Sequence, residues 1–402
     1  MTTMASATAY TFDAVVVGGG PAGATAAADL ARRGRAVLLL DRAGRIKPCG
    51  GAIPPRALTD FGIPEGLLVA RATGATIVSP KDRRVDMPID GGFVGMVDRE
   101  VFDEWLRDRA AAVGAERRAG TFESLTRDVD GTAVVEYRPK GAGRDAPLTR
   151  VRARAVIGAD GALSGVGKAA GIPGADTVPY VFAYHEIVRT PAAGFDGQRC
   201  DVYYKGELSP DFYAWIFPHG ETCSVGTGSA CKGFALREAV GALRGIAGLD
   251  GAETVRREGA PIPLKPLKRW DNGRDVVLAG DAAGVVAPAS GEGIFYAMLG
   301  GRLAGEAVEQ LLATGDAKAL LSARRRFMKV HGPVFWILGV MQRYWYGTDE
   351  RRERFVSICR DRDVQQLTWD AYMNKELVRA RPLAHVRIFF KNIAHLTGLV
   401  SA

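Results

Sequence analysis

The sequence contains little cysteine and no long hydrophobic run. Its five cysteines, in a chain of 402 residues, include no Cys-x-x-Cys pair. This spacing excludes a disulfide framework and a structural zinc site, so we expect reduced thiols and no bound metal. The longest apolar run is Val334–Met341, far shorter than the about 20 residues that a membrane-spanning helix needs.

The start of the chain shows no secretory signal, because Met1–Tyr10 lack a basic region followed by an apolar stretch. The net charge of +8 is concentrated in residues 318–402, and the preceding residues are almost neutral. Such a basic segment favours an anionic partner surface, and no nucleic-acid-binding motif accompanies it. We therefore expect a cytoplasmic protein that contacts a membrane peripherally and binds no nucleic acid.

Glycine, in contrast, is abundant, with 50 residues and no Gly-X-Y period. Hydrophobic residues make up 47% of the chain and charged residues 24%, which excludes wholesale disorder. The length predicts two connected domains or one domain with large insertions.

A dinucleotide-binding motif stands near the N-terminus. Asp13–Val17 reads as a buried strand, Gly18–Gly23 has the form Gly-x-Gly-x-x-Gly, and Ala24–Arg33 is a helix-forming stretch. Ala36–Leu40 then reads as a second strand that ends in Asp41. Glycines allow the tight turn, the approach of a pyrophosphate and close helix packing, and the acid can bind ribose hydroxyls. We assign to the cofactor Gly18, Gly20, Ala22, Gly23, Asp41 and Arg42.

Two later motifs indicate which dinucleotide binds. Ala155–Gly161 is a strand that ends in Asp-Gly, and Val276–Gly284 is a strand that ends in Gly-Asp. Together with the turn Pro288–Ile294, this order resembles the FAD-dependent aromatic-hydroxylase superfamily. The resemblance implies that Asp281 binds the ribityl or pyrophosphate part of FAD. It also implies that the turn lies beside the isoalloxazine ring, so Pro288, Gly291, Gly293 and Ile294 are cofactor residues.

The sequence has no second Gly-x-Gly-x-x-Gly for a nicotinamide cofactor. Either the nicotinamide binds transiently against the flavin, or electrons arrive by another route. Arg99 opens an amphipathic helical segment, Asp98–Ala110. In similar flavoproteins an arginine at this place contacts the cofactor, and the alternative is a solvated helix arginine.

Two further patterns concern the reaction. Cys49 is followed by Gly50 and Gly51, which permit close approach of the backbone to the flavin or a substrate. The alternative for Cys49 is an ordinary buried cysteine.

Tyr213, Trp215 and Phe217 alternate along a predicted strand, so they share one face. That face is either a core or the lining of a long apolar pocket suited to a polyisoprenoid chain; we assign to substrate binding Gly50, Gly51, Tyr213, Trp215 and Phe217.

Three sequence stretches, KPCGGAIPPR, the PxxYxWxFP pattern at 210–218 and GDAAGVVAPASGEGIFYA, resemble the geranylgeranyl reductase family. Residues 344–375 resemble its chlorophyll and bacteriochlorophyll branch. The resemblance implies saturation of three of the four C=C bonds of a geranylgeranyl group to give phytyl. It implies a diphosphate or a (bacterio)chlorophyll ester as the substrate, FAD as cofactor, NADPH as the usual donor and a place at the photosynthetic membrane.

An isolated alkene cannot stabilise a carbanion, so we expect protonation of one carbon with hydride delivery to the other. The site must exclude water, and aromatic faces can stabilise passing positive charge. We assign Cys49 as the first candidate for a proton relay or flavin contact, and Tyr213 as the second. Glu292 is expected near the flavin, but it could equally be an acid that only stabilises the start of a helix.

The predicted fold class is α/β, with a FAD-binding Rossmann-like domain of the aromatic-hydroxylase type, an antiparallel-sheet substrate domain and a helical C-terminal segment. The FAD-binding domain is expected at 10–60, 95–170 and 270–315, and the substrate domain at 61–94 and 171–268. Residues 318–402 are expected to form a basic helical surface; its aromatic residues are Phe335, Trp336, Trp345, Phe389 and Phe390.

Two other functions stay open at this point. A flavin hydroxylase or halogenase would share the fold but would need a small polar pocket for chemistry with oxygen. A prenyl-binding escort would bind the chain without reacting with it. The intact phosphate loop, Gly-Asp motif and isoalloxazine turn argue against the escort.

Overall fold

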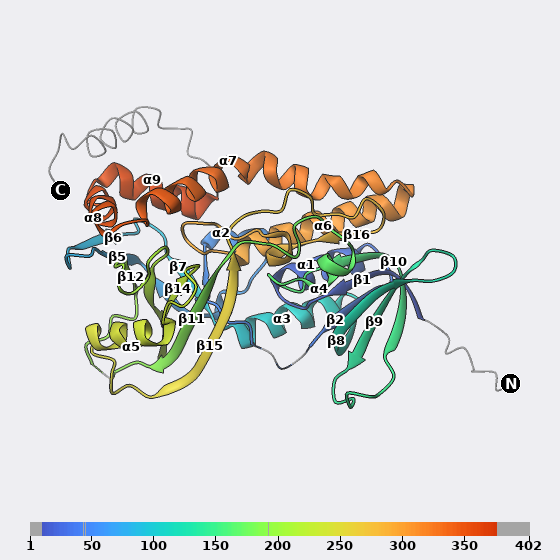
Figure 1. The fold of residues 1–402 in the computed structure, drawn as a ribbon, viewed down its shortest axis with the longest axis horizontal. Coiled ribbons are helices and arrows are strands. Elements are labelled where there is room, and N and C mark those ends of the chain that lie inside the picture. Colours follow the sequence, from blue (N-terminus) through green and yellow to red (C-terminus); the bar gives the residue numbers. More distant parts are fainter. Residues whose placement is uncertain (1–9, 43, 45, 192, 376–402) are drawn as a thin grey trace.

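The computed structural model describes residues 10–42, 44, 46–191 and 193–375, and it contains a parallel sheet, a large second sheet and a C-terminal group of helices (Figure 1). Two short 3₁₀ helices, Glu65–Leu67 and Ala317–Leu320, link larger elements. The parts of the predicted basic C-terminal surface that carry Phe389 and Phe390 lie outside the described residues.

The first sheet carries the dinucleotide motif. Its parallel strands run in the order β8-β2-β1-β10-β16, and β9 pairs antiparallel with both β8 and β10. The central strands are almost wholly apolar because helices or further chain cover both faces of the sheet. The strands are β1 (Tyr10–Val17), β2 (Val37–Asp41), β8 (Glu116–Arg127), β9 (Ala133–Pro139), β10 (Thr149–Gly158) and β16 (Val276–Leu278).

Helix α1 (Pro21–Arg32) packs between α3 (Arg99–Ala112) and α6 (Ile294–Thr314), and α4 (Gly165–Ala169) lies against β8. The approach of α1 to α6 depends on small residues. A Cβ atom on Gly301 would lie 2.1 Å from the carbonyl oxygen of Ala22. The alanine-rich composition of α1 therefore serves close packing as well as helix formation.

The second sheet has the order β15-β11-β14-β13-β12-β5-β6. As expected, its pairings are antiparallel, except for β12 with β5, which run parallel. The pair joins strands far apart in the chain, which a hairpin cannot connect. The strands are β5 (Gly74–Val78), β6 (Arg84–Pro88), β11 (Tyr180–Arg189), β12 (Arg199–Tyr203), β13 (Ala214–His219), β14 (Thr222–Ser229) and β15 (Thr254–Pro263).

Smaller elements connect the two large sheets. Strands β3 (Ala52–Ile53), β7 (Val94–Val97) and β4 (Leu68–Ala72) form a three-stranded sheet. Helix α2 (Pro55–Phe61) follows β3, and α5 (Leu236–Ile246) packs on β14 and β11.

The chain then forms α7 (Leu321–Trp345), α8 (Asp349–Ile358) and α9 (Arg362–Asn374). Helix α7 lies against α6 and runs along the upper side of the molecule in Figure 1. Phe335 and Trp345 are buried, so they are wrongly placed in the predicted surface, whereas Trp336 is exposed. Among the described residues, no helix is both long enough and apolar enough to span a bilayer.

The α/β class predicted from the sequence is confirmed, and most differences are at the ends of elements. The first helix begins at Pro21 rather than Ala24, because proline is well suited to the first turn of a helix. The strand predicted at Ala155–Gly161 belongs to the longer β10, which ends at Gly158, before the Asp-Gly pair. The second sheet draws its strands from both 61–94 and 171–268, while the division into domains stays a prediction.

Candidate active site

The glycine loop between β1 and α1 is tightly packed on one side and open on the other. Gly18 has φ of +103°, and a Cβ atom there would lie 2.3 Å from the carbonyl oxygen of Ala159. A Cβ atom on Gly23 would lie 1.8 Å from the carbonyl oxygen of Gly18. At Gly20, by contrast, a Cβ atom would meet nothing within 4 Å, and no side chain caps the start of α1. An uncapped helix start facing open space fits a pyrophosphate group.

Asp41 lies beside this loop at the end of β2. Its Oδ2 atom accepts a hydrogen bond from the backbone N–H of Gly19 at 2.7 Å. Arg107 of α3 lies 3.9 Å from the Asp41 carboxylate and donates to the carbonyl oxygen of Gly19 at 3.4 Å. Arg42, the next residue, is exposed. Sequence reasoning missed Arg107, which no motif marks.

The Gly-Asp motif forms a short 3₁₀ helix, Gly280–Ala283, directly after β16. The Asp281 side chain is largely buried and forms an ion pair with Lys47, which comes from the loop after β2. Gly280 has φ of +63° and lies against Ala22 of α1. The first and last glycine motifs therefore meet. Residues 46–51, which carry Cys49 and which we call the cysteine loop, reach these motifs through Lys47.

The turn before α6 is held by its own backbone. The N–H of Gly291 donates to the carbonyl oxygen of Ala287 at 2.8 Å, and the N–H of Ala287 donates to that of Glu292 at 2.9 Å. Gly291 has φ of +65°, a conformation that favours glycine. Pro288 and Ile294 are buried, and no side chain caps Gly293 at the start of α6.

Two tyrosines fasten the second sheet and α7 to this turn. The Tyr213 hydroxyl donates to the carbonyl oxygen of Ser290 at 2.6 Å, and the Tyr346 hydroxyl donates to that of Ala289 at 3.1 Å. Burial, with smaller contributions from Tyr346 and Cys49, raises the pKa of Tyr213 above its ordinary value. Tyr213 therefore stays protonated near neutral pH and holds the turn.

The three alternating aromatic residues form one continuous row. The rings of Tyr213 and Trp215 meet edge to face at 5.9 Å, and those of Trp215 and Phe217 stack at 6.0 Å. The Trp215 indole N–H donates to Ser224 Oγ at 3.1 Å. The row is packed with side chains of α7 and α9, among them Met341 and Trp369. It is therefore part of a core as the structure stands.

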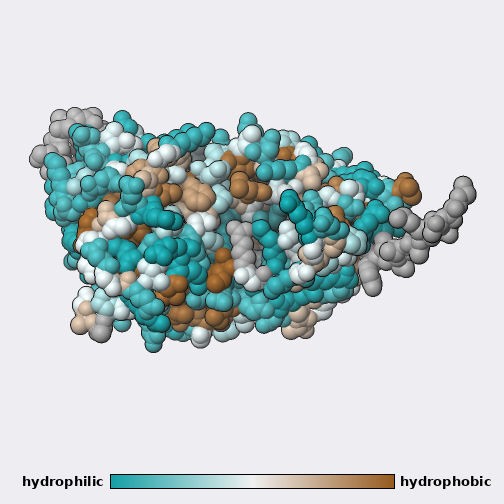
Figure 2. Space-filling model, turned by 60° about the horizontal axis from the view of Figure 1, so that its bottom comes forward, coloured by the Kyte–Doolittle hydropathy of each residue, from teal (hydrophilic) through white to brown (hydrophobic). Residues whose placement is uncertain are grey.

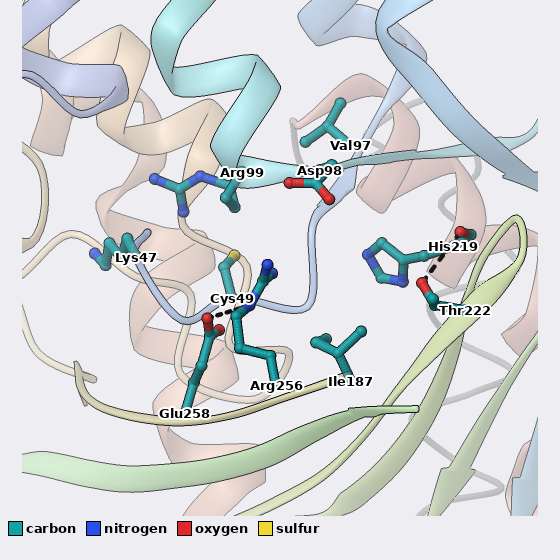
Figure 3. Close-up of a pocket in the computed structure, with 10 residues that line it drawn as sticks. All are labelled: Lys47, Cys49, Val97, Asp98, Arg99, Ile187, His219, Thr222, Arg256 and Glu258. Atoms are coloured by element: carbon teal, nitrogen blue, oxygen red, sulfur yellow. Dashed lines mark hydrogen bonds and ion pairs between the residues drawn. The ribbon is translucent and has the colours of Figure 1, made fainter. Parts of the chain in front are cut away.

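Cys49 lies at a small, charged pocket that is partly open to solvent (Figure 3). On one side the lining side chains come from the cysteine loop, the end of β7 and the start of α3, and on the other side they come from β11, β13, β14 and β15 of the second sheet. The lining residues are Lys47, Cys49, Val97, Asp98, Arg99, Ile187, His219, Thr222, Arg256 and Glu258. Cys49 is partly buried and packs at the edge of the first core, so its role in the reaction stays a prediction.

The pocket is bordered by fixed charges. Arg99 is buried and binds both carboxylate oxygens of Asp103 at 2.7 and 2.8 Å, so the alternative of a solvated arginine is wrong. Burial alone would lower the pKa of Arg99, but Asp103 and Cys49 raise it above its ordinary value. Burial lowers the pKa of His219, which is therefore neutral near pH 7. Asp103 stands four residues after Arg99, a helical spacing that could have predicted the pair.

Gly50 and Gly51 bring the cysteine loop against the second sheet. A Cβ atom on Gly50 would lie 2.9 Å from the Phe217 ring. Gly51 has φ of +72°, and a Cβ atom there would lie 2.4 Å from the carbonyl oxygen of Val97. The two glycines thus allow the loop that carries Cys49 to contact the end of the aromatic row.

A buried ion pair joins this region to the end of α9. Lys375 and Glu292 are in contact, with side chains only 2% and 4% exposed. The ammonium group also lies 3.7 Å from the centre of the Tyr372 ring, and Glu292 Oε1 has no hydrogen-bond partner among the described residues. Burial raises the pKa of Glu292 and lowers that of Lys375, effects that the pairing opposes. Sequence reasoning missed Lys375, because nothing in its neighbourhood distinguishes it.

These features fit a bound FAD. The open space at Gly20, the uncapped start of α1 and Asp41 together suit the adenosine and pyrophosphate end of a dinucleotide. Within the described part of the chain, no group of three or more His, Cys, Asp or Glu side chains could hold a metal ion.

Comparisons with known proteins agree with this geometry. A family model described as "FAD binding domain" matches residues 11–329. Geranylgeranyl diphosphate reductase of Rhodobacter capsulatus is 56% identical over 97% of this chain and 98% of its own length. The protein of that name from Synechocystis is 34% identical over 95% of this chain and 97% of its own length.

Among solved structures, a geranylgeranyl bacteriochlorophyll reductase-like protein from Thermoplasma acidophilum has a TM-score of 0.80 at 21% identity, covering 93% of this chain and 99% of its own. The flavin-dependent brominase Bmp2 has a TM-score of 0.71 at 18% identity, covering 95% and 99%. At these identities the structures show the fold alone. The sequence relatives and the FAD-binding match establish that the chain belongs to the geranylgeranyl diphosphate reductase family of FAD-binding proteins.

Proposed function

We propose that this protein saturates three of the four C=C bonds of a geranylgeranyl group and so produces phytyl. The substrate is geranylgeranyl diphosphate or the geranylgeranyl ester of a (bacterio)chlorophyll, and NADPH is the donor. The proposal is supported by family membership and by the name of the Rhodobacter capsulatus relative.

The observation that carries the proposal is the meeting of three motifs at one loop. Lys47 of the cysteine loop pairs with Asp281, and Gly50 of the same loop lies against Phe217. Tyr213, at the other end of the aromatic row, bonds to the turn at Ser290. A cysteine between a flavin-type motif and an apolar aromatic row suits chemistry on a hydrocarbon chain.

FAD, when bound, supplies the hydride that alkene reduction requires. The glycine loop would hold its pyrophosphate and Asp41 its ribose, and Asp281 would hold the ribityl or pyrophosphate part. The turn from Pro288 to Ile294 would hold the ring. Arg99, anchored by Asp103, contributes positive charge at the same pocket.

The protein's own part in the chemistry is to deliver a proton and exclude water. Cys49 is the proton relay, because its thiol lies at the pocket between the two sheets. Trp215 and Phe217 surround the prenyl chain and stabilise positive charge on the tertiary carbon through their ring faces. Tyr213 positions the turn and is the second candidate for the proton relay. A chain that reaches the row displaces contacts with α7 and α9.

A test uses the purified protein with geranylgeranyl diphosphate or the pigment ester and either NADPH or NADH. The proposal predicts products heavier by two, four and six hydrogen atoms, formed faster with NADPH. A faster reaction with NADH would overturn the donor assignment. Products that contain added oxygen or halogen would instead support the monooxygenase alternative, and a protein that binds the chain without any product would support the escort.

The cellular setting follows from the substrate. A geranylgeranyl chain partitions into lipid, so we propose that the protein is cytoplasmic and peripheral at the photosynthetic membrane. The basic C-terminal helical region supports this placement.

A further inference from the structure

The outer face of α7 carries exposed apolar residues along one side of the helix. Val330 is 52% exposed, Trp336 70%, Ile337 37% and Val340 42%. Their spacing places them on one side of α7, with exposed Pro333 among them. Of the thirteen large hydrophobic side chains exposed in the described residues, five belong to α7. We call Val330, Pro333, Trp336, Ile337 and Val340 the outer face.

The face shown in Figure 2 gives a comparison for this concentration of exposed apolar residues. The face shown in Figure 2 is mostly hydrophilic, and its apolar residues form separate patches. Single exposed apolar residues are normal in soluble proteins, whereas a row of them along one helix marks a contact surface.

Cations border the outer face at both ends. Arg325, Arg326 and Lys329 are exposed at its N-terminal end, and Arg343 is exposed at its C-terminal end. Helix α7 contains no acidic residue. An apolar strip bordered by Lys and Arg is complementary to a bilayer surface with anionic headgroups.

The inward side of α7, at Leu338 and Gly339, and its flank at Met341 reach the candidate active site. Leu338 and Met341 pack on the cluster that contains Tyr213 and Trp215. A Cβ atom on Gly339 would lie 3.9 Å from Pro288 of the turn before α6. One helix, about 10 Å across, therefore separates the outer face from the aromatic row.

We propose that the outer face of α7 docks on the surface of a lipid bilayer that contains anionic lipids. This inference rests on the proposed function, since it explains how a prenyl chain dissolved in a membrane reaches the aromatic row. The helix lies in the plane of the interface with Trp336 at the headgroup level, and Arg325, Lys329 and Arg343 contact the lipid phosphates, whereas Arg326 pairs with Glu306.

Binding to vesicles tests the proposal with the full chain. We compare the native protein with Trp336→Asp and Val340→Asp by co-sedimentation with phosphatidylcholine vesicles that contain or lack phosphatidylglycerol. We expect native binding only to the anionic vesicles, weakened by salt. Each variant should need at least about tenfold more lipid for half-maximal binding.

The matched control is Val129→Asp, which places the same charge on an exposed apolar residue in the turn between β8 and β9. It should bind vesicles like the native protein. Equal binding by all four proteins, or native binding to neutral vesicles alone, would overturn the proposal. A native dimer that Trp336→Asp dissociates, with no vesicle binding, would instead assign the outer face to a second copy of the chain.

A detergent-dispersed substrate separates this inference from the proposed function. The outer-face variants should reduce it at the native rate and lose activity only when the substrate is embedded in anionic vesicles. If the native protein reduces neither form, the proposed function fails, while the vesicle-binding result still decides the role of α7.

Discussion

Cys49 lies where the cysteine loop packs against the second sheet. Its neighbours Gly50 and Gly51 have no room for side chains, so the backbone position of the thiol is closely determined. Lys47 anchors the other side of the loop at Asp281. A group that is only partly buried at a charged pocket can exchange protons with solvent, as a relay must.

Replacement of Cys49 with alanine should impair alkene reduction about 10²- to 10⁴-fold, the usual contribution of a proton-transferring group. FAD content, measured by absorbance, should change little because the phosphate-binding loop is separate. The control is Cys200→Ala, which removes a thiol from the packing around the aromatic row. Burial raises the pKa of Cys200 to about 12, so it stays protonated. An equal loss of flavin and activity in Cys49→Ala would make Cys49 structural.

The Lys375–Glu292 pair makes a prediction about stability. Lys375→Met should lower the free energy of unfolding by about 3–5 kcal/mol, because a buried carboxylate loses its partner. The pKa of Glu292 is already raised by burial, so its ionisation in the folded protein is costly and the loss should grow as pH rises above about 4.3. Urea unfolding of the native protein and the variant at several pH values measures this loss in the free energy of unfolding.

The double variant Glu292→Gln with Lys375→Met should recover part of the loss, since it removes both charges. If Lys375→Met alone unfolds like the native protein at pH 8, the pair has no structural role.

Local sequence patterns predicted some of these residues and missed others. Gly18, Gly23 and Asp41 follow from a motif whose members are neighbours in the chain. Lys47 and Lys375 find their partners across the fold, more than 80 residues away in sequence, so only the packing of elements reveals them.

At the scale of elements, the contact between α1 and α6 connects the two ends of the flavin-binding region. Helix α1 begins at the glycine loop, and α6 begins at the turn proposed to lie beside the isoalloxazine ring. Gly301 allows the two helices to meet, so their spacing sets the distance between the two motifs.

Gly301→Ala should therefore lower both stability, by about 1–3 kcal/mol, and FAD content, because the new methyl group overlaps the backbone of Ala22. The matched control is Gly241→Ala in α5, where a Cβ atom would meet nothing within 4 Å. That variant should gain about 0.5–1 kcal/mol from helix propensity. Thermal unfolding measures the change in stability, and flavin absorbance measures the FAD content. A Gly301→Ala protein that retains full flavin content would contradict the account.

Helix α5 is joined to the second sheet by a buried ion pair. Arg244 donates to Glu186 of β11 at 2.6 Å. Burial raises the pKa of Glu186, but hydrogen bonds from Tyr184 and Arg244 and the charge of Arg257 outweigh it and lower the pKa below its ordinary value. The stabilisation is therefore present above about pH 4.3 and is lost as pH falls through the lowered pKa.

Arg244→Met should destabilise the protein by about 3 kcal/mol at neutral pH, and the difference from the native protein should shrink below about pH 4. Chemical unfolding at neutral and acid pH measures both quantities. A difference that stays constant with pH would show that packing of the arginine, rather than its charge, provides the stability.

The types of the main elements could be predicted from the sequence, but their partners in space could not. Hydrophobic runs such as Val37–Leu40 predict buried strands, and the alternation of Tyr213, Trp215 and Phe217 predicts a shared face. The parallel pairing of β5 with β12 depends on contacts between distant segments, which no local pattern encodes.

At the scale of the whole molecule, the site lies between two sheets and beneath the C-terminal helices (Figure 1). The loops of the first sheet provide the glycine motif and Asp281, the second sheet provides the aromatic row, and α7 covers that row. This arrangement places the proposed source of electrons on one side of the aromatic row and the helix proposed to contact the membrane on the other.

The most direct test of alkene reduction is anaerobic. The flavin of the purified protein is reduced chemically, excess reductant is removed, and geranylgeranyl diphosphate or the pigment ester is added without oxygen. The account predicts reoxidation of the flavin with formation of a product that carries two more hydrogen atoms. A flavin that stays reduced until oxygen is admitted, with no hydrogenated product, would contradict it.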